Sequence, residues 1–327
     1  MKYLFVFLLI AVTNLHRAQT ETTVQPKCEE IDGLQIEDGT AIIERSFPTD
    51  YSGVVFRCSN NYVKELLNIR NGKKEGVFRS WYTNGQLMVE LNYQDGTQDG
   101  ISHTWYENGQ LNIEWNYKDG NKDGIGHEWH KNGQLIRSLN YKDGKENGLC
   151  RGWYANGQLG GEIVYKNGKE NGKGIVWYNN GKLKFENNYR DGKKNGIQRS
   201  WMENGNLEYE RDFKDGKKDG LSKEWYDDGV LEFERNFKDG KKDGVWKSYS
   251  SNGQLNREQN FKDGEKNGLV RLWHPNGQLR HEGNYKKGKL DGLSRWWRNN
   301  GQLESERNFK DGVRINEIRW DKFGNQE

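Results

Sequence analysis

The feature that most constrains this chain is a 24-residue repeat that runs through ten copies without an insertion or a deletion. Its clearest marker is a dipeptide, Asn-Gly in nine copies and Asp-Gly in one. The glycines of these pairs are Gly85, Gly109, Gly133, Gly157, Gly181, Gly205, Gly229, Gly253, Gly277 and Gly301. Repeats of fixed length predict a stack in which each copy contacts the next with constant geometry.

Each repeat also carries large side chains at fixed positions. Two residues after the marker glycine stands a leucine, from Leu87 to Leu303, and eight residues after it a Tyr or Phe, from Tyr93 to Phe309. Four residues before the glycine stands an aromatic residue: Trp81, Trp105, Trp129, Trp153, Trp177, Trp201, Trp225, Tyr249, Trp273 or Trp297. We expect the aromatic columns to stack from repeat to repeat and to replace a thick globular core.

Turn signals that recur about every 12 residues between short apolar-alternating segments predict β-hairpins. Asn-Gly is the strongest signal for a two-residue hairpin loop, because a type I′ turn needs positive φ at both positions. The Asp-Gly-Lys segment predicts a looser turn that leads to the next hairpin. The predicted fold is therefore all-β: an elongated, twisted antiparallel sheet of stacked hairpins, on the order of 100 Å long.

Two loop lengths remain open, and they place the side chains differently. A two-residue Asn-Gly loop sets basic residues opposite glutamates, at about 0.2–1 kcal/mol per pair. The pairs are Arg79–Glu90, Arg199–Glu210 and Arg271–Glu282. A three-residue loop with a glycine bulge would instead gather the Trp, Leu and Tyr/Phe columns on one face. We favour the two-residue loop, because the alternative leaves a long apolar face uncovered.

Composition narrows the class of protein. Hydrophobic residues make up 32% and aromatic residues 13% of the chain, with 41 Gly and 3 Pro. The aromatic content argues against disorder, and the glycine content argues against helices. Lys and Arg number 51 against 48 Asp and Glu, and the signs alternate along the chain. No long basic stripe is evident, so we expect no nucleic-acid partner.

The segment 1–20 is typical of a secretory signal peptide. Lys2 gives a positive start, an apolar run follows from Tyr3 to Val12, and small residues stand near Ala18. The run is too short to span a bilayer, and no later stretch is long enough, so we expect no transmembrane span in the mature chain. The predicted location is secreted or cell-envelope associated.

The domain organisation predicted from these features has five parts. They are a signal peptide at 1–20, a leader or cap at 21–52, a degenerate first repeat at 53–76, ten hairpin repeats at 77–316 and a terminal half-repeat at 317–327. Export permits a disulfide, and Cys28 and Cys58 could pair, while Cys150 lies far away in the regular array. Three cysteines do not fix a pairing from sequence alone.

The repeat resembles a known family. The segment 105–124, with its Trp-Tyr, Asn-Gly-Gln-Leu and Lys-Asp-Gly elements, is similar to the MORN-repeat variant of bacterial proteins, many of which are labelled YwqK-type antitoxins. The resemblance covers roughly residues 53–324. It implies a protein that binds and neutralises a toxin, and it brings no catalytic residues and no cofactor. Eukaryotic MORN proteins suggest protein scaffolding and contact with membrane lipids.

The columns offer few candidates for chemistry. A glutamate stands nine residues after each Trp, from Glu90 to Glu306 except at Ser138. Paired carboxylates hydrolyse glycosides, but every repeat has the same arrangement, so no single site is distinguished and we expect no enzyme. His103 and His127 lie about two strands apart, too far to share a metal. We therefore predict no metal and no cofactor.

The variable tyrosine after the Trp column is the better candidate for an exposed contact. The five candidates are Tyr82, Tyr106, Tyr154, Tyr178 and Tyr226. The first functional hypothesis is a non-enzymatic, exported scaffold that binds a protein partner, such as a toxin, along its extended sheet. The alternative is an extracellular protein that binds a cell-surface glycan or the cell envelope.

Overall fold

The computed structural model describes residues 24–36 and 40–327, so the predicted signal peptide lies outside the described residues. The chain divides into two compact units, which we call unit 1 (to Gly157) and unit 2 (Gln158–Glu327). Each unit is treated separately. In the described part of the chain no α-helix is long and apolar enough to cross a membrane.

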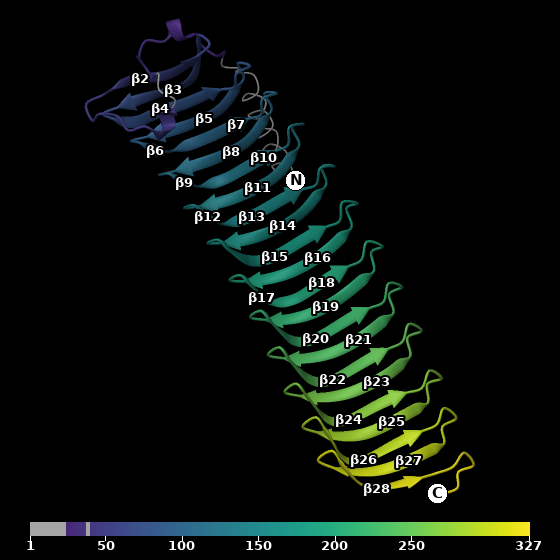
Figure 1. The fold of residues 1–327 in the computed structure, drawn as a ribbon. Coiled ribbons are helices and arrows are strands. Elements are labelled where there is room, and N and C mark those ends of the chain that lie inside the picture. Colours follow the sequence, from purple (N-terminus) through teal and green to yellow (C-terminus); the bar gives the residue numbers. More distant parts are fainter. Residues whose placement is uncertain (1–23, 37–39) are drawn as a thin grey trace, which may run out of the picture. The chain divides into compact units, whose positions relative to one another are not determined.

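Unit 1 begins with two short 3-10 turns and the short strand β1, which pairs with β2 in parallel, and it continues as antiparallel strands (Figure 1). Its elements are η1 (Cys28–Glu30), β1 (Leu34–Gln35), η2 (Ile42–Glu44), β2 (Gly53–Ser59), β3 (Tyr62–Arg70), β4 (Lys73–Trp81), β5 (Leu87–Gln94), β6 (Thr97–Gln98), β7 (Gly100–Trp105), β8 (Leu111–Lys118), β9 (Asn121–Lys122), β10 (Gly124–Trp129), β11 (Leu135–Lys142), β12 (Lys145–Glu146) and β13 (Gly148–Trp153).

Unit 2 consists of strands and turns throughout. Its strands are β14 (Leu159–Lys166), β15 (Lys169–Trp177), β16 (Leu183–Arg190), β17 (Lys193–Lys194), β18 (Gly196–Trp201), β19 (Leu207–Lys214), β20 (Lys217–Trp225), β21 (Leu231–Lys238), β22 (Lys241–Tyr249), β23 (Leu255–Lys262), β24 (Glu265–Trp273), β25 (Leu279–Lys286), β26 (Lys289–Trp297), β27 (Leu303–Lys310) and β28 (Val313–Arg319). The prediction of an all-β protein built from hairpin repeats is confirmed.

The sequence predicts a tight two-residue turn at Asn-Gly and a looser turn at Asp-Gly, and the structure shows the reverse. The Asp-Gly turn is the tight one: Asp95 and Gly96 both have positive φ, at 49° and 88°, and the flanking Gln94 and Thr97 pair directly. This is the two-residue type I′ geometry. The prediction of a type I′ turn at the Asn-Gly marker is wrong, because in the ten marker pairs, from Gly85 to Gly301, only the glycine has positive φ.

The Asn-Gly loop is instead a three-residue loop with a glycine bulge. The Gly85 amide donates to the Tyr82 carbonyl at 3.1 Å, and the Tyr82 amide donates to the Gln86 carbonyl at 2.8 Å. The Asn84 side-chain oxygen accepts from the Gln86 amide at 3.0 Å and so holds the turn from within. Because this side-chain bond suits a type I turn, the asparagine has no need of positive φ.

A second bulge restores the pairing that the longer loop would otherwise shift. Trp81 pairs with Leu87, but Ser80 pairs with Val89, so that Met88 is an extra residue in its strand. Beyond this bulge Arg79 lies opposite Glu90. The predicted Arg–Glu register is confirmed in the three pairs Arg79–Glu90, Arg199–Glu210 and Arg271–Glu282.

The sheet therefore has two distinct faces. Side chains alternate between the two sides of a strand. Arg79 and Trp81 therefore share one face with their partners Glu90 and Leu87. We call it the constant face, because its columns recur in nearly every repeat. The opposite side of the sheet is the variable face. It contains the positions equivalent to Phe78 and the positions that pair with them on the neighbouring strands. The Tyr/Phe column belongs to the variable face, so the Trp and Tyr/Phe columns are separated.

Neighbouring repeats are tied at both rows of turns. At the Asn-Gly loops, the side-chain amide of Asn84 donates to the backbone carbonyl of Glu107 at 2.9 Å. At the Asp-Gly turns, the Gly120 amide donates to the Gln98 carbonyl at 2.8 Å, and the Asp99 carboxylate accepts from the Asp119 amide at 3.0 Å. These ties need an unchanging residue count between turns, which explains the strict period.

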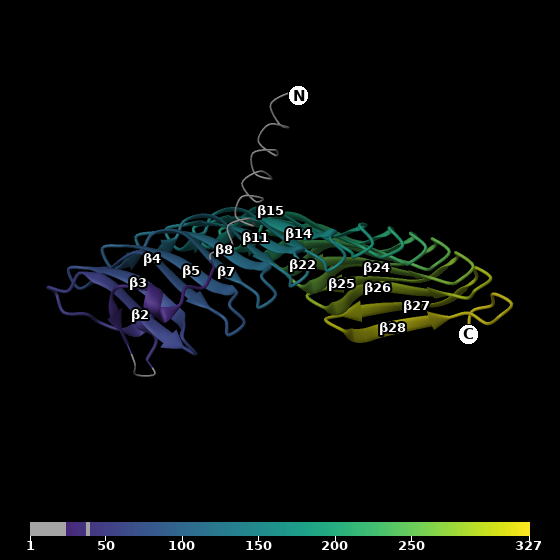
Figure 2. The ribbon, with the colours of Figure 1, turned by 90° about the horizontal axis from the view of Figure 1, so that it is seen from above.

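The N-terminal segment packs on both faces of the first hairpin, β2–β3 (Figure 2). On one face Ile42 of η2 is fully buried against Val55 and Leu67. On the other face Cys28 and Ile31 pack against Phe56 and Val63. The described part of the predicted leader or cap is thus a cap, and the larger apolar cores of the chain lie beneath it.

The cysteines follow the same division. Cys28 and Cys58 form a disulfide that links the cap to β2. Cys150 has a free thiol and is buried on the variable face, where burial raises its pKa. The predicted degenerate repeat at 53–76 contains the hairpin β2–β3, whose loop is a tight Asn60-Asn61 turn with positive φ at both residues.

The turn geometry makes a testable distinction at Gly205, which has φ of 102° and no atom within 4 Å of the place a Cβ would take. Gly205→Ala is expected to cost about 1–2 kcal/mol, because a Cβ disfavours this conformation. Gly205→Asn is expected to cost less, because asparagine tolerates positive φ. Urea unfolding of both variants measures the difference, with Glu107→Ala, at an exposed position of the equivalent loop in another repeat, as the neutral control. Equal losses for Ala and Asn would contradict the assigned geometry.

Candidate binding face

The constant face of unit 1 carries a ladder in which glutamates alternate with Arg and His side chains. Arg79 Nε lies 2.7 Å from the Glu90 carboxylate, which also faces His103 Nδ1 at 3.9 Å. His103 Nε2 lies 3.1 Å from Glu114, and His127 Nδ1 lies 3.6 Å from the other oxygen of that carboxylate. Each glutamate therefore stands between basic groups of two successive strands.

Glu114 is the most strongly affected member of this ladder. Hydrogen bonds from His103 and His127 lower its pKa from 4.5 to about 2, against the opposing effect of burial. A carboxyl group with so low a pKa remains ionised at neutral pH and cannot act as a general acid there. Glu114 is thus held ionised between His103 and His127.

Unit 2 has a ladder of the same kind on its own constant face. Its ion pairs are Lys173–Glu186, Arg199–Glu186, Arg199–Glu210, Lys223–Glu234, Arg271–Glu258, Arg271–Glu282 and Arg295–Glu306. Because the charges satisfy one another within the sheet, this face offers little unpaired charge to a ligand. Among the described residues no cluster of three or more His, Cys, Asp or Glu side chains is placed to hold a metal ion.

The candidate tyrosines lie at contacts between repeats. The hydroxyls of Tyr82, Tyr106 and Tyr178 donate to the carbonyl oxygens of the Trp in the following repeat, at 2.8–2.9 Å. Tyr226 bonds the Tyr249 carbonyl at 2.9 Å in the same way, and Tyr154 is also engaged. All five side chains are half-buried. Their hydroxyls therefore serve the stack, although the sequence suggests exposed contacts.

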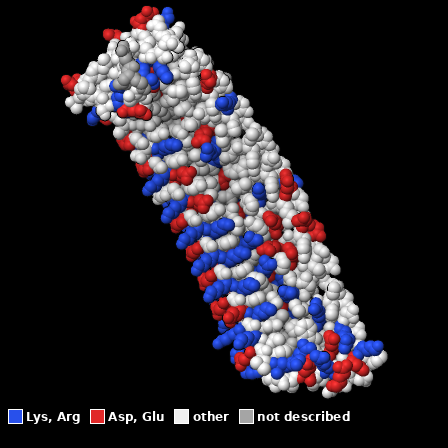
Figure 3. Space-filling model, viewed as in Figure 1, with Lys and Arg blue, Asp and Glu red and all other residues white. Residues whose placement is uncertain are grey.

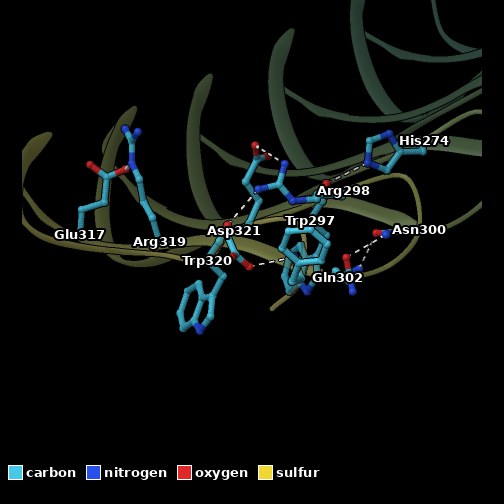
Figure 4. Close-up of polar contacts among 11 residues, drawn as sticks. His274, Trp297, Arg298, Asn300, Gln302, Glu317, Arg319, Trp320 and Asp321 are labelled. Carbon is cyan, nitrogen blue, oxygen red and sulfur yellow. Dashed lines mark hydrogen bonds and ion pairs between the residues drawn. The ribbon is translucent and has the colours of Figure 1, made fainter. Parts of the chain in front are cut away.

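In two repeats another residue type replaces the tyrosine and makes the same contact (Figure 4). His274 Nε2 donates to the Trp297 carbonyl at 2.9 Å, and Arg298 Nη2 donates to the Trp320 carbonyl at 2.9 Å. Three chemically different donors thus perform one function. The contact therefore does not depend on an aromatic ring. At the same position of two other repeats, Met202 has a side chain that cannot make the contact, and Ser250 bonds within its own loop.

The variable face differs from repeat to repeat. At the position of Phe78 it carries Phe78, Ser102, Gly126, Cys150, Gly174, Gln198, Ser222, Trp246, Val270 and Ser294 in successive repeats. These residues range from glycine to tryptophan, while the hairpin around them is unchanged. Nine of the ten are buried and Trp246 is half-buried, so this column changes the packing beneath the face. The surface itself changes at more open positions of the same face, such as that of Tyr209, Phe233 and the exposed Arg257.

Four successive repeats of unit 2 place a lysine over the aromatic ring of the same repeat, near the Asp-Gly turns. The pairs, with distances from Nζ to the ring centroid, are Lys194–Phe213 (5.2 Å), Lys218–Phe237 (4.9 Å), Lys242–Phe261 (5.0 Å) and Lys266–Tyr285 (5.0 Å). Cation–π contacts of this kind hold the lysine stem down and leave the ammonium at the surface.

Two arginines stand beside this lysine series. The guanidinium carbon of Arg211 lies 3.8 Å from the Tyr209 ring centroid, and that of Arg235 lies 3.7 Å from the Phe233 ring centroid. Both arginines share the Glu224 carboxylate, at 3.0 Å and 3.1 Å. We call Lys194, Lys218, Lys242, Lys266, Arg211 and Arg235 the basic row.

The basic row carries more positive charge than its acidic neighbour balances. Burial lowers the pKa of Lys218, and the nearby Arg211 and Arg235 lower it further while Glu224 opposes them. Lys and Arg side chains gather in rows across unit 2 near its Asp-Gly turns (Figure 3). The basic row is not evident in the linear sequence. Its lysines stand one full repeat apart, and residues of both charges lie between them. Comparing residues by position in the repeat would have revealed it.

The variable face of unit 1 has a smaller group of similar type. Lys122 Nζ lies 3.5 Å from the Trp115 ring centroid, and that ring meets Tyr141 edge-on at 5.4 Å. Arg137 pairs with Glu128 at 2.7 Å, so the arginine charge is balanced here. Unit 1 therefore presents its aromatic groups without a series of uncompensated cations.

A buried histidine marks the variable face near the C-terminal end of unit 2. His281 is 3% exposed, its ring centroid lies 4.0 Å from that of Trp296, and its Nε2 lies 2.9 Å from the Ser294 hydroxyl. Burial, followed by the charges of Arg280 and Arg307, lowers its pKa to about 4. At neutral pH the imidazole is uncharged and acts as a packing group.

Comparison with known families finds ten consecutive matches to the model described as MORN repeat variant. The matched residues are 74–95, 98–119, 122–143, 146–167, 170–191, 194–215, 218–239, 242–263, 266–287 and 290–311. No curated protein matches the chain.

Two solved structures are similar over most of the chain. They are titled "Crystal Structure of TcdB2-TccC3-Cdc42" and "Crystal Structure of TcdB2-TccC3", each at 13% identity over 82% of this chain. The matched regions span 15% and 19% of those chains, with TM-scores of 0.17 and 0.16. At such scores the likeness carries no argument about fold or function.

The pKa of Glu114 predicts a pH dependence of stability. Folding lowers this pKa from 4.5 to about 2, so the stabilisation is present above pH 4.5 and is lost as the pH falls towards 2. Glu114→Gln is expected to cost about 1–2 kcal/mol at pH 6, reduced by partial exposure. The gap from the parent protein should close by about pH 2. Urea unfolding between pH 6 and 2 measures it, with Glu107→Gln on the exposed loop as control; a gap independent of pH would disprove the role.

Proposed function

The chain belongs to the MORN repeat variant family, and we propose that it is a non-enzymatic, exported scaffold that binds a protein partner along its variable face. The observation that carries the proposal is the difference between the two faces. On the constant face, basic residues and glutamates pair with each other in repeat after repeat. On the variable face, aromatic and basic residues change with each repeat, which supports recognition by that face.

The composition of the variable face suits a protein partner. Interfaces between proteins are enriched in Tyr, Trp, Phe and Arg, and these types gather around Trp246, with Phe237 and Phe261 at centroid distances of 5.2 Å and 5.0 Å. Aromatic and arginine side chains also dominate binding energy at such interfaces. A toxin as the partner remains part of the proposal, supported by the family resemblance alone.

The proposal of export has two supports. The segment 1–20 has the pattern of a signal peptide. The disulfide between Cys28 and Cys58 fits an oxidising compartment outside the cytosol. A location in the cell envelope or outside the cell follows from both.

A glycan partner is the weaker alternative. Sugar rings bind to open aromatic faces, whereas Tyr209 and Phe233 are covered by arginines and Phe237 by a lysine. The half-buried tyrosines of the Trp-Tyr pairs are used between repeats. We therefore favour the protein partner.

Site-specific photo-crosslinking on intact cells tests the proposal. A photoreactive residue replaces Arg257, which is exposed on the variable face, or Leu221, which is 36% exposed on the constant face. We expect one reproducible protein adduct, at least several-fold stronger from position 257, because a partner on that face lies within reach only there. No adduct, or adducts of equal strength from both positions, would contradict the proposal.

A reporter fusion tests export separately. Residues 1–27 placed before alkaline phosphatase, which is active only after its disulfides form outside the cytosol, should give activity well above that of the same fusion lacking residues 1–20. Replacing Val6 and Leu8 by Asp should abolish the gain, because charges interrupt the apolar run. Reporter activity that persists in the Asp variant would overturn the assignment.

A further inference from the structure

We propose that the basic row of unit 2 binds an extended acidic polypeptide segment, in polyproline II conformation, whose carboxylates recur at every third residue. The inference rests on the proposed function, since it names the chemistry of the protein partner. It depends on three observations: the charge of the row, the way its cations are held, and their spacing.

The first observation is the charge. The basic row has six cations, and Glu224 is the carboxylate that bridges its two arginines. Glu208 and Glu232 precede the arginines by three residues and lie toward the Asn-Gly loops, where Glu208 accepts from the Ser200 hydroxyl at 2.6 Å. The lysine series lies at the opposite ends of the strands, near the Asp-Gly turns. An anionic ligand would relieve the repulsion among these cations.

The second observation is how the cations are held. The guanidinium groups of Arg211 and Arg235 stack on aromatic rings at 3.8 Å and 3.7 Å, and their side chains are 26% and 21% exposed. Stacking fixes the planar groups before a ligand arrives, so less conformational entropy is lost on binding. It also covers the rings, which leaves N–H donors and not open aromatic faces for the ligand. Carboxylates are the protein groups that such donors bind best.

The third observation is the spacing. Equivalent residues of successive repeats lie two strands apart, which is about 9.6 Å. A polyproline II segment rises about 3.1 Å per residue with three residues per turn, so every third side chain points the same way at intervals of about 9.3 Å. Same-side residues of a β-strand recur at only about 6.7 Å. The period of the basic row therefore matches a polyproline II segment and not a β-strand.

The test uses the full mature protein and a fluorescein-labelled peptide of six Glu-Pro-Pro triplets, followed by fluorescence anisotropy at two salt concentrations. A second peptide has the same composition, with its six Glu in one block. We expect the triplet peptide to bind about tenfold more tightly than the block peptide, because only its carboxylates match consecutive repeats. Binding should weaken with salt.

Charge-removing variants locate the binding. Arg211→Gln with Arg235→Gln should weaken binding of the triplet peptide about tenfold or more, through loss of charge-assisted hydrogen bonds. Lys218→Gln with Lys242→Gln is a second variant that leaves the Glu224 bridge intact and should act in the same direction. The control is Lys214→Gln with Lys238→Gln, which removes the same charge from exposed residues adjoining the Asp-Gly turns, and it should bind nearly as the parent does.

Competition distinguishes other ligand classes. Polygalacturonate, a dT oligonucleotide and vesicles of phosphatidylserine with phosphatidylcholine are each added to the bound triplet peptide. The concentration of each competitor is expressed as the concentration of its anionic groups. The inference would be overturned if any competitor displaced the labelled peptide at a lower concentration than the unlabelled triplet peptide does. Equal binding of the two peptides would also overturn it, as would equal loss in row and control variants. If the peptide experiments contradict the inference but crosslinking from position 257 still captures a protein, only the inference is wrong. If no protein is captured, the proposed function is wrong as well.

Discussion

The structure depends on the cancellation of two register shifts within each hairpin. The three-residue Asn-Gly loop displaces one strand against the other, and the extra residue at the position of Met88 restores the pairing. With one irregularity alone, the side-chain alternation would turn the charged column and the Tyr/Phe column to the wrong faces. Because both recur in the repeats of each unit, basic residues and glutamates meet along one face, and the other face is free to vary.

The two faces consequently have different functions in the chain. The constant face holds the stack together with ion pairs, such as Arg199–Glu210 at 2.6 Å, and with the packed Trp and Leu columns. Isolated surface ion pairs contribute little, but Glu90, Glu114 and Glu186 each meet two basic groups, and networks of this kind are worth more than single pairs. The variable face has a buried column at the position of Phe78, so substitutions that alter recognition without altering the fold are expected at its exposed positions, such as Arg257.

Much of the fold could be predicted from the sequence, because the period and the alternation leave few other solutions. Arg79 opposite Glu90 followed from counting residues about the loop. The loop type did not, since Asn-Gly and Asp-Gly both allow a type I′ turn and the choice depends on the Asn84 side chain and a distant bulge. The basic row was missed for another reason: Arg211 and Glu224 belong to different strands and become neighbours only when those strands pair. The exposure of Tyr82 was misjudged because its partner is a carbonyl in the following hairpin.

The ties between successive turns have an evolutionary consequence. Each hairpin contacts its neighbours through bonds that join residues at a fixed distance along the chain, such as Asn84 to Glu107 and Asn108 to Lys131. Loss or duplication of one whole repeat would leave these bonds with equivalent partners, so descendants of this chain can change in length by whole hairpins. The number of recognition positions can then change without a change in the residues that occupy them. Selection can therefore adjust the length of the binding surface and its specificity independently.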